Sequence, residues 1–269
     1  MKTHHILLAL FSGLFVASCE KIIEVPLNAA NPQIVVEAVV RNQLGDNYVL
    51  LSRSVEVYSS EDVPMISGAT VVVRDQDNNI YSFAEIPDEP GKYTCPTLQA
   101  EPFQQYTLEI TIDGVLITAE SKTNSIPVID SVTTIQDSFG LEEFLGFIPH
   151  QVVYHSTDPG AETNFYEALL WINDTISDFD YFGNDEPING QHYSAPFIGD
   201  LARAGDSVTV VLVSGDQAYY DYIYSFSNQQ TGSPFSASPG NPVSNIVGDG
   251  TLGYFAALLS DTVSMQIPD

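Results

Sequence analysis

The segment 104–121 alternates hydrophobic and polar side chains on either side of a two-residue turn. Apolar residues occupy every second position from Tyr106 to Ile112, with threonines and a glutamate between them. A period of two is typical of a strand with one buried face. Asp113-Gly114 is a favoured two-residue hairpin turn, and the strand-like sequence VLITAES follows it. We therefore expect an antiparallel hairpin here, which commits this part of the chain to a sheet with a buried face.

Short strand-like runs separated by turn residues recur along most of the chain, which predicts a mainly β fold of two β-sandwich-like domains. We place an immunoglobulin-like sandwich at 33–125 and a second β-rich domain at 126–269, with a boundary at Asn124–Pro127. In the first domain we expect strands at 34–40, 48–58, 68–75, 80–86, from Tyr93 onward, 104–113 and 115–121. In the second we expect strands at 128–136, 150–157, 164–173 and 206–214, and a final pair at 252–260 and 262–267.

The second domain also contains one segment with helical periodicity. Ser214 and Gln217 are spaced as a capping box, and Gly232 and Pro234 follow as stop signals. A strand is the alternative, because tyrosine favours β structure. The residues at helical spacing are Ala218, Tyr219, Tyr222, Ile223 and Phe226.

The N-terminus resembles a bacterial lipoprotein signal. Lys2 precedes an apolar stretch from Ile6 to Val16, and Val16-Ala17-Ser18-Cys19 resembles a lipobox. We predict that 1–18 is a signal peptide, that Cys19 is lipidated, and that 19–32 is a tether. Two or three acyl chains would anchor the protein durably. The alternative is an ordinary signal peptide with a chance cysteine.

Charge excludes one large class of partner. The chain has 35 acidic and 8 basic residues and a formal net charge of -27, so it repels nucleic-acid phosphates. Hydrophobic residues make up 44% of the chain, which is enough for a sizeable core. With Cys19 lipidated, Cys95 has no disulfide partner, and we expect it to be a structural thiol.

Several motifs that suggest chemistry lack the surroundings that the chemistry needs. Residues 248–253 match G-x-G-x-x-G, but no strand precedes them and no helix follows, so we expect a bend before a strand. Asp75–Asn79 resembles the start of a calcium loop without its glycine and closing glutamate, which favours a hairpin turn. His150 and His155 should face opposite sides of one strand. We expect no cofactor and no enzymatic activity.

The insertion 174–200 is acidic and aromatic, and we expect a long ordered loop. Its carboxylates Asp178, Asp180 and Asp185 are weak cation candidates only, and we predict no metal site. Exposed aromatic side chains bind sugar faces or protein partners, although they can equally form a small core under the loop. The candidate surface comprises Phe179, Tyr181, Phe182 and Tyr193, together with Trp171.

The order of several short motifs resembles the DUF4249 lipoproteins of Bacteroidota. The matching segments are SCEKIIEVPL, NPQIVVEAVV, GATVVVRD with GKY, Ile129–Val132, and the ending SPFSASPGNPVSNIVGDGTLGYFAA. The resemblance implies a lipoprotein of the periplasm or outer membrane, often encoded near TonB-dependent receptors, with a first domain like carboxypeptidase-regulatory or macroglobulin-type sandwiches. The family has no established activity, so it supplies no catalytic residues.

We therefore expect a membrane-anchored accessory lipoprotein of the cell envelope that binds an outer-membrane protein such as a TonB-dependent transporter. The alternatives are a glycan- or peptide-binding module for nutrient capture, and a hydrolase that uses the carboxylates of 174–200. Outer-membrane attachment through Cys19 is the expectation. Between Cys19 and the apolar Ile22-Ile23 there are only two charged residues, Glu20 and Lys21. This short charged segment leaves open which face of the outer membrane carries the protein.

Overall fold

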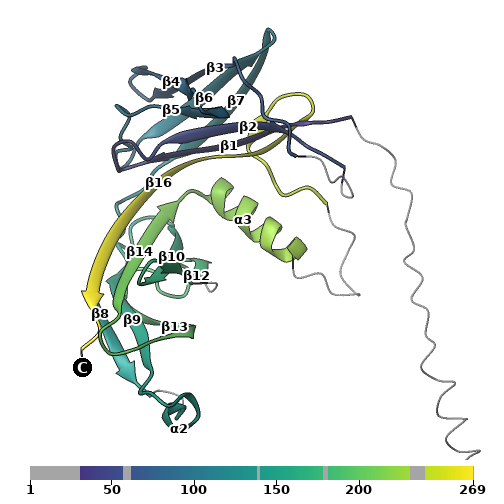
Figure 1. Cartoon of the computed structure of the whole chain (residues 1–269). Coiled ribbons are helices and arrows are strands. Elements are labelled where there is room, and N and C mark those ends of the chain that lie inside the picture. Colours follow the sequence, from purple (N-terminus) through teal and green to yellow (C-terminus); the bar gives the residue numbers. More distant parts are fainter. Residues whose placement is uncertain (1–30, 57–61, 138–139, 178–180, 231–239, 269) are drawn as a thin grey trace, which may run out of the picture. The chain divides into compact units, whose positions relative to one another are not determined.

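The protein is mainly β, as the sequence predicts, and its strands are arranged as packed sheets (Figure 1). The predicted signal peptide and nearly all of the predicted tether lie outside the described residues. The computed structural model describes residues 31–56, 62–137, 140–177, 181–230 and 240–268.

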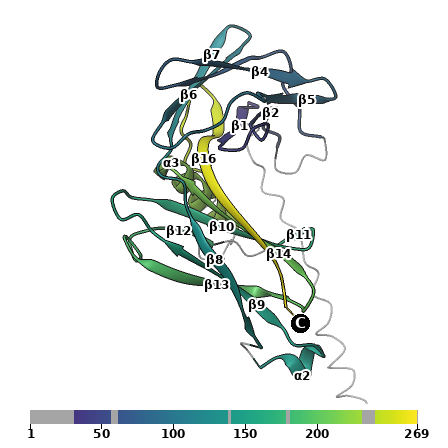
Figure 2. The ribbon, with the colours of Figure 1, turned by 90° about the vertical axis from the view of Figure 1, so that its left-hand side faces the viewer.

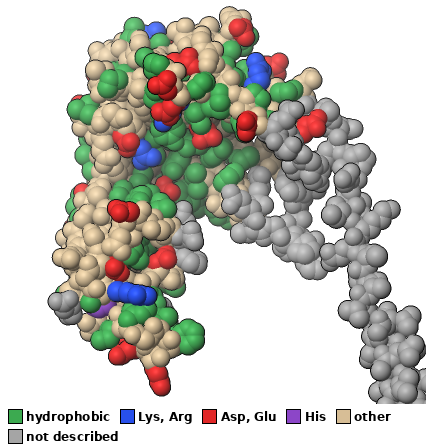
Figure 3. Space-filling view, in the orientation of Figure 1, with side chains coloured by type: hydrophobic (Ala, Val, Ile, Leu, Met, Phe, Trp, Pro, Cys, Tyr) green, Lys and Arg blue, Asp and Glu red, His purple; other side chains and the backbone are tan. Residues whose placement is uncertain are grey.

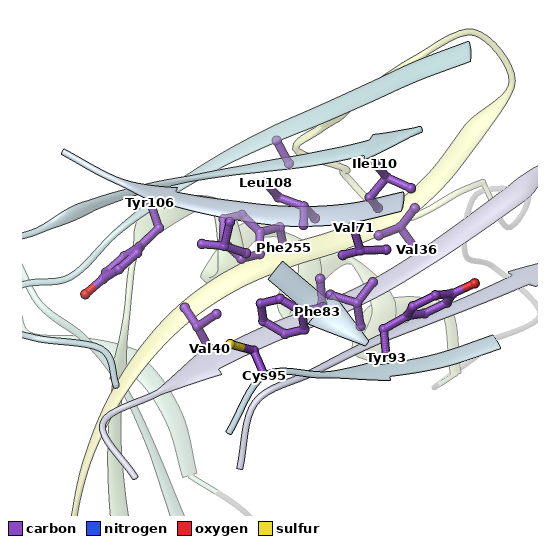
Figure 4. Packing of buried hydrophobic residues seen from close by; sticks show 14 of the residues in the cluster. Val36, Val40, Val71, Phe83, Tyr93, Cys95, Tyr106, Leu108, Ile110 and Phe255 are labelled. Carbon is purple, nitrogen blue, oxygen red and sulfur yellow. The ribbon is translucent and has the colours of Figure 1, made fainter. Parts of the chain in front are cut away.

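The first half of the chain forms two layers around one core. β1, β2, β5 and β4 are neighbours in one part of the sheet, and β3, β6 and β7 continue it on the other side of the core. Tyr93 and Leu108 are among the fully buried side chains of this core (Figure 4), and Leu51 is another. The strands are β1 (Ile34–Arg41), β2 (Tyr48–Arg53), β3 (Thr70–Asp75), β4 (Ile80–Ile86), β5 (Glu89–Thr94), β6 (Gln105–Ile112) and β7 (Val115–Lys122).

The predicted hairpin at 104–121 is confirmed. β6 and β7 pair antiparallel with Ile112 opposite Val115, which leaves Asp113-Gly114 as a two-residue loop. Both turn residues have positive φ, 51° at Asp113 and 83° at Gly114. That combination is the type I′ geometry whose twist matches the flanking strands.

The second half of the chain builds another pair of layers. The sheet β13-β9-β8 packs on β10 and β14, and Val152, Leu170 and Leu212 are fully buried between them (Figure 2). The elements are β8 (Ile129–Gln136), α2 (Glu142–Leu145), β9 (His150–Thr157), β10 (Phe165–Ile172), β11 (Thr175–Ile176), β12 (Tyr181–Asn184), β13 (His192–Ala202), β14 (Ser207–Gly215), α3 (Gln217–Gln230), β15 (Ile246–Val247) and β16 (Thr251–Gln266).

The expectation of a long loop at 174–200 is wrong, because this segment contributes β11, β12 and part of β13. β13 borders its sheet, with β9 as the neighbour that the structure describes, and its register shifts between Pro196 and Leu201. A border strand tolerates a proline, which lacks the N–H that an inner strand must donate. Pro196 and Gly199 therefore mark β13 as an irregular edge strand, whereas Pro187 and Gly190 lie in the turn before it.

The predicted C-terminal strand pair is also wrong, since 251–266 is one continuous strand. β16 pairs parallel with β1 and antiparallel with β14 (Figure 1). Its Phe255 is buried in the first core, and its Val263 and Met265 pack against the second. From Pro32 onward the chain forms a single compact unit. The boundary at 125/126 stays a prediction, and β16 contributes to the cores on both sides of it.

The glycine-rich segment before β16 is a bend, as expected. Gly250 has φ 65°, and β16 begins at the next residue. Gly253 lies opposite Val36 of β1 with φ 105°. A Cβ at that position would lie 1.9 Å from the Val36 carbonyl oxygen. The glycine thus permits close approach of two parallel strands rather than binding a dinucleotide.

Neither helix in the described part of the chain has the length and apolar character needed to cross a membrane.

Candidate functional site

Helix α3 is the predicted helix, and a carboxylate at its N-terminus fixes it to the first sandwich. Asp216 Oδ1 accepts the backbone N–H of Tyr219 at 2.9 Å, the geometry of an N-cap. Its Oδ2 accepts the Ser121 hydroxyl at 2.8 Å and the Lys122 backbone N–H at 3.1 Å. One buried side chain therefore both begins the helix and joins it to β7.

The predicted capping box of Ser214 and Gln217 is wrong. Ser214 belongs to β14, and its buried hydroxyl has no hydrogen-bond partner among the described residues. Asp216 directly precedes the first helical residue, so its carboxylate reaches the free N–H groups of the first turn. The sequence contains this signal, because aspartate is a favoured N-cap residue.

The inner side of α3 packs on the face of the sheet formed by β1, β14 and β16 (Figure 1). Tyr219 and Ile223 contact a cluster that includes Val213 and Leu258. The Tyr219 hydroxyl donates to Glu167 Oε2 at 3.0 Å. Burial, and then the neighbouring Glu167 carboxylate, raise the pKa of Tyr219 well above its ordinary value. The helix is thus held to the sheet by an apolar contact and a polar one.

A row of four aromatic rings lies beside this packing contact. We call Phe165, Phe182, Tyr220 and Tyr224 the aromatic row. The ring centroids of Phe182 and Tyr220 are 4.8 Å apart with an interplanar angle of 13°, and those of Phe165 and Tyr220 are 5.1 Å apart. Tyr220 and Tyr224 follow at 5.8 Å and 10°.

The aromatic row combines order with exposure. Phe165, Phe182 and Tyr220 are half-buried, whereas Tyr224 is 56% exposed. Offset-stacked rings favour one arrangement, so a ligand would find the surface already formed. Such a surface suits an apolar or aromatic group of a protein, or the face of a sugar ring.

The structure separates the predicted aromatic residues into two groups. Tyr181 and Tyr193 pack against the second core, and the Tyr181 hydroxyl donates to the Pro196 carbonyl. For these two, the alternative of a small core under the insertion holds. Phe182 packs against the cluster beneath α3 and also belongs to the aromatic row. Trp171 is half-buried and lies on the same face of β10 as Phe165, while Phe179 lies outside the described residues.

Sequence reasoning missed Phe165, Tyr220 and Tyr224. Tyr220 and Tyr224 are four residues apart, a spacing that brings side chains together on one side of a helix. The spacing is visible in the sequence, on the side of the helix away from the predicted apolar positions Tyr219 and Ile223. Phe165 and Phe182 come from different strands, and only tertiary packing brings them to the helix.

Of the three carboxylates predicted as weak cation candidates, the structure describes only Asp185. Asp178 and Asp180 lie outside the described residues. Asp185 is 1% exposed, and its Oδ2 accepts the Asn164 backbone N–H at 2.8 Å. Asp158 is also buried and accepts the Tyr166 hydroxyl at 2.8 Å and the Gly190 N–H at 2.8 Å. In the parts of the chain that the structure describes, no group of three or more His, Cys, Asp or Glu is placed to hold a metal ion.

Asp75 and Cys95, two other residues considered for chemistry, lie where they stabilise the fold. Asp75 Oδ1 accepts the backbone N–H groups of Asp77 and Asn79, which closes the β3–β4 turn as expected. Burial would raise the pKa of the Asp75 carboxyl, but hydrogen bonds from Asn79 and Asp77 outweigh it and lower that pKa. Cys95 is 2% exposed within the first core, which agrees with a structural role.

His150 and His155 lie on opposite faces of β9, as predicted. His150 is buried, whereas His155 lies 2.8 Å from the Thr133 hydroxyl and 2.7 Å from that of Ser194 on the outer face. The His192 ring is parallel to that of His155, with centroids 6.2 Å apart, and its Nδ1 lies 3.3 Å from Asp130 Oδ2. Both nitrogens of His155 are already occupied by hydroxyl groups.

A small cavity of about 300 Å³ opens beside the start of α3. Its lining includes Gln105, Glu120, Lys122 and Gln217, and it contains no aromatic side chain. Small-molecule sites are mostly apolar with a few polar groups, which makes this cavity a weaker candidate than the aromatic row.

Comparison with curated proteins gives no match. The family model described as a domain of unknown function, DUF4249, matches residues 20–263, which is most of the chain. The match includes the first core, most of the second, α3 and the aromatic row, and it begins directly after Cys19. The chain therefore belongs to the DUF4249 family.

Proposed function

We propose that this protein is a non-enzymatic accessory lipoprotein of the cell envelope, anchored through Cys19, which binds an outer-membrane protein such as a TonB-dependent transporter. The aromatic row is the observation that carries the proposal. Tyrosine and phenylalanine are enriched in protein interfaces, where a rigid ring supplies contact area at a low entropic cost.

The aromatic row is held in place by ordered elements, which makes it suitable as a binding surface. α3 is fixed at its start by Asp216 and along its length by contacts to the sheet, so Tyr220 and Tyr224 are presented by an ordered element. A preorganised surface loses less side-chain entropy on binding than a flexible loop does. A partner could therefore bind the row without a large conformational change.

The predicted anchor is compatible with such a partner in the same membrane. Pro32, where the compact unit begins, is thirteen positions after Cys19. At full extension this segment spans at most roughly 45 Å. The binding surface would then stay close to the membrane, and tethering would raise its effective concentration near an embedded partner.

Purification from detergent-solubilised membranes of the native host tests the proposal. We expect the unaltered lipoprotein to bring down one outer-membrane protein, identified by mass spectrometry, and the double variant Tyr220→Ala/Tyr224→Ala to lose most of it. Ile80→Ala is the control, because Ile80 is 59% exposed on β4, outside the aromatic row. A lipoprotein that migrates without an outer-membrane protein would refute the proposal.

A glycan- or peptide-binding module for nutrient capture is the second candidate. It is favoured by the exposed face of Tyr224 and by the half-buried Trp171, which lies on the same side of β10 as Phe165. In a glycan array or thermal-shift screen, this function predicts a ligand that raises the melting temperature. The effect should disappear in Trp171→Ala or Tyr224→Ala and persist in Ile80→Ala.

A further inference from the structure

A second exposed surface lies in the connection between β8 and β9. We call Leu141–Ile148 the α2 tip. Phe144 is 87% exposed, the highest value among the large hydrophobic side chains that the structure describes, and Ile148 is 46% exposed. Glu142 and Glu143 beside them are also exposed. Around the position of α2, hydrophobic and acidic side chains share the surface (Figure 3).

The α2 tip has a defined structure that holds Phe144 outward. Asp137 Oδ1 accepts the backbone N–H groups of Leu141 and Glu142, the latter at 3.1 Å. Gly146 ends the turn with φ 72°, and its N–H donates to the Glu142 carbonyl at 2.8 Å. These bonds fix the backbone on both sides of Phe144, so its exposure is set by the fold of the tip.

A cation–π contact anchors the base of the tip. The Arg203 guanidinium carbon lies 4.0 Å from the ring centroid of Phe147. Phe147 is half-buried by this arrangement, whereas Phe144, three residues earlier, remains uncovered. The two phenylalanines therefore differ in role: one attaches the tip to the second sandwich, and the other faces solvent.

The negative charges beside Phe144 favour one kind of partner. Glu142 and Glu143 make no ion pair with any described residue. Arg203 is the last basic residue of the chain and the first after Lys122. A second copy of this acidic chain would bring like charges, and anionic lipid headgroups would repel the two carboxylates. A basic protein surface would supply the positive charges with which Glu142 and Glu143 can pair.

We infer that the α2 tip docks into an apolar pocket of a protein partner whose rim carries lysine or arginine residues. Phe144 fills the pocket, and Glu142 and Glu143 pair with the rim. Buried aromatic side chains dominate many interfaces, and complementary charge at the rim speeds and orients association. The inference does not depend on the aromatic row, because the two surfaces share no residue.

Site-specific photo-crosslinking in the native host tests this inference on the full lipoprotein. Benzoylphenylalanine replaces Phe144 in one strain and Leu116 in a control strain, since Leu116 is 58% exposed on β7. From position 144 we expect an adduct with one protein, attached within an apolar segment flanked by lysine or arginine. The control position should not give this adduct.

Reversing the charge of Glu142 and Glu143 tests whether the adduct at 144 depends on charge pairing and not on proximity alone. With the label at 144, Glu142→Lys/Glu143→Lys should reduce the adduct about tenfold or more, because the rim would then be repelled. With the partner purified, Phe144→Ser should weaken binding by roughly thirtyfold. Both changes are at exposed positions, so an unchanged melting temperature verifies folding.

Each of the following outcomes would overturn the inference. One is an adduct with a second copy of this chain. Another is binding of the purified chain to vesicles of phosphatidylcholine, alone or mixed with phosphatidylglycerol, that Phe144→Ser abolishes. The third is the absence of any specific adduct at 144, and the fourth is an adduct that is insensitive to charge reversal. If the partner is lost in Tyr220→Ala/Tyr224→Ala but not in Phe144→Ser, the result would support the proposed function. It would contradict the inference that the α2 tip docks into this partner.

Discussion

At the scale of single residues, Gly253 has a role that no other residue type can fill. Its φ of 105° is unfavourable for a side chain, and a Cβ would lie 1.9 Å from the Val36 carbonyl oxygen. Gly253→Ala should therefore lower the free energy of unfolding by roughly 3 kcal/mol, measured by denaturant titration. Gly183→Ala is the control, because a Cβ there meets nothing within 4 Å. Equal stability of the two variants would contradict the strained geometry at Gly253.

Buried tyrosines predict a loss of stability at high pH. Burial is the main cause that raises the pKa of Tyr154, Tyr166, Tyr219 and Tyr254 above the ordinary 10.0. Below about pH 10 these phenols are protonated in both states, so their contribution to stability is fully present. Above it the unfolded chain releases protons that the folded chain retains, and stability falls by up to about 1.4 kcal/mol per pH unit for each group.

Phenolate absorbance during a pH titration measures this effect. In the folded protein a fraction of the tyrosines should ionise only as the protein unfolds, whereas in denaturant all should ionise near pH 10. Coincident titration curves in the two conditions would show that the four phenols are not protected.

At the scale of elements, substitutions at the start of α3 distinguish the predicted N-cap, Ser214, from the observed one, Asp216. Asp216→Ala removes the N-cap bond to Tyr219 and the bonds to β7, and should cost about 2 kcal/mol. Ser214→Ala should be neutral or slightly stabilising, because the Ser214 hydroxyl is buried without a partner in the described structure. Thermal unfolding of both variants checks this order, and a larger loss for Ser214→Ala would favour the capping box.

The elements that sequence predicted well are those whose pattern is local. The β6–β7 hairpin needs only alternation and Asp113-Gly114, and both are visible in the sequence. The continuity of β16 was not visible, because Ser260-Asp261 resembles a turn between two strands. In the structure these residues stay in the strand, and Asp261 Oδ2 accepts the Ile129 N–H at 2.8 Å. A polar pair inside a strand is stable here because a distant segment supplies its partner.

The same distinction applies to the candidate site. The spacing of Tyr220 and Tyr224 on a helix is local information, and it makes half of the aromatic row predictable. Phe165 and Phe182 reach the row through the pairing of β10 with β12, which places Glu167 opposite Phe182. Register between strands distant in sequence depends on tertiary packing, so the row as a whole could not be predicted from one sequence.

At the scale of the whole molecule, β16 should make the two cores unfold together. It supplies Phe255 to the first core and packs Val263 against the second, so loss of either core exposes part of the same strand. Trp171 is the single tryptophan and lies in β10, so its fluorescence reports on the second half of the chain.

Leu108→Ala, in the first core, therefore tests the coupling. Leu108 is fully buried, and its truncation should cost about 2–5 kcal/mol. If the cores unfold cooperatively, the Trp171 fluorescence transition shifts to lower denaturant as far as it does for Leu170→Ala, a change of the same type at an equally buried position of the second core. If the halves are independent domains, Leu108→Ala leaves the Trp171 transition in place, and a separate transition detected by circular dichroism moves instead. The first result would mean that a partner bound to either half stabilises both, because binding to the native state stabilises the whole cooperative unit.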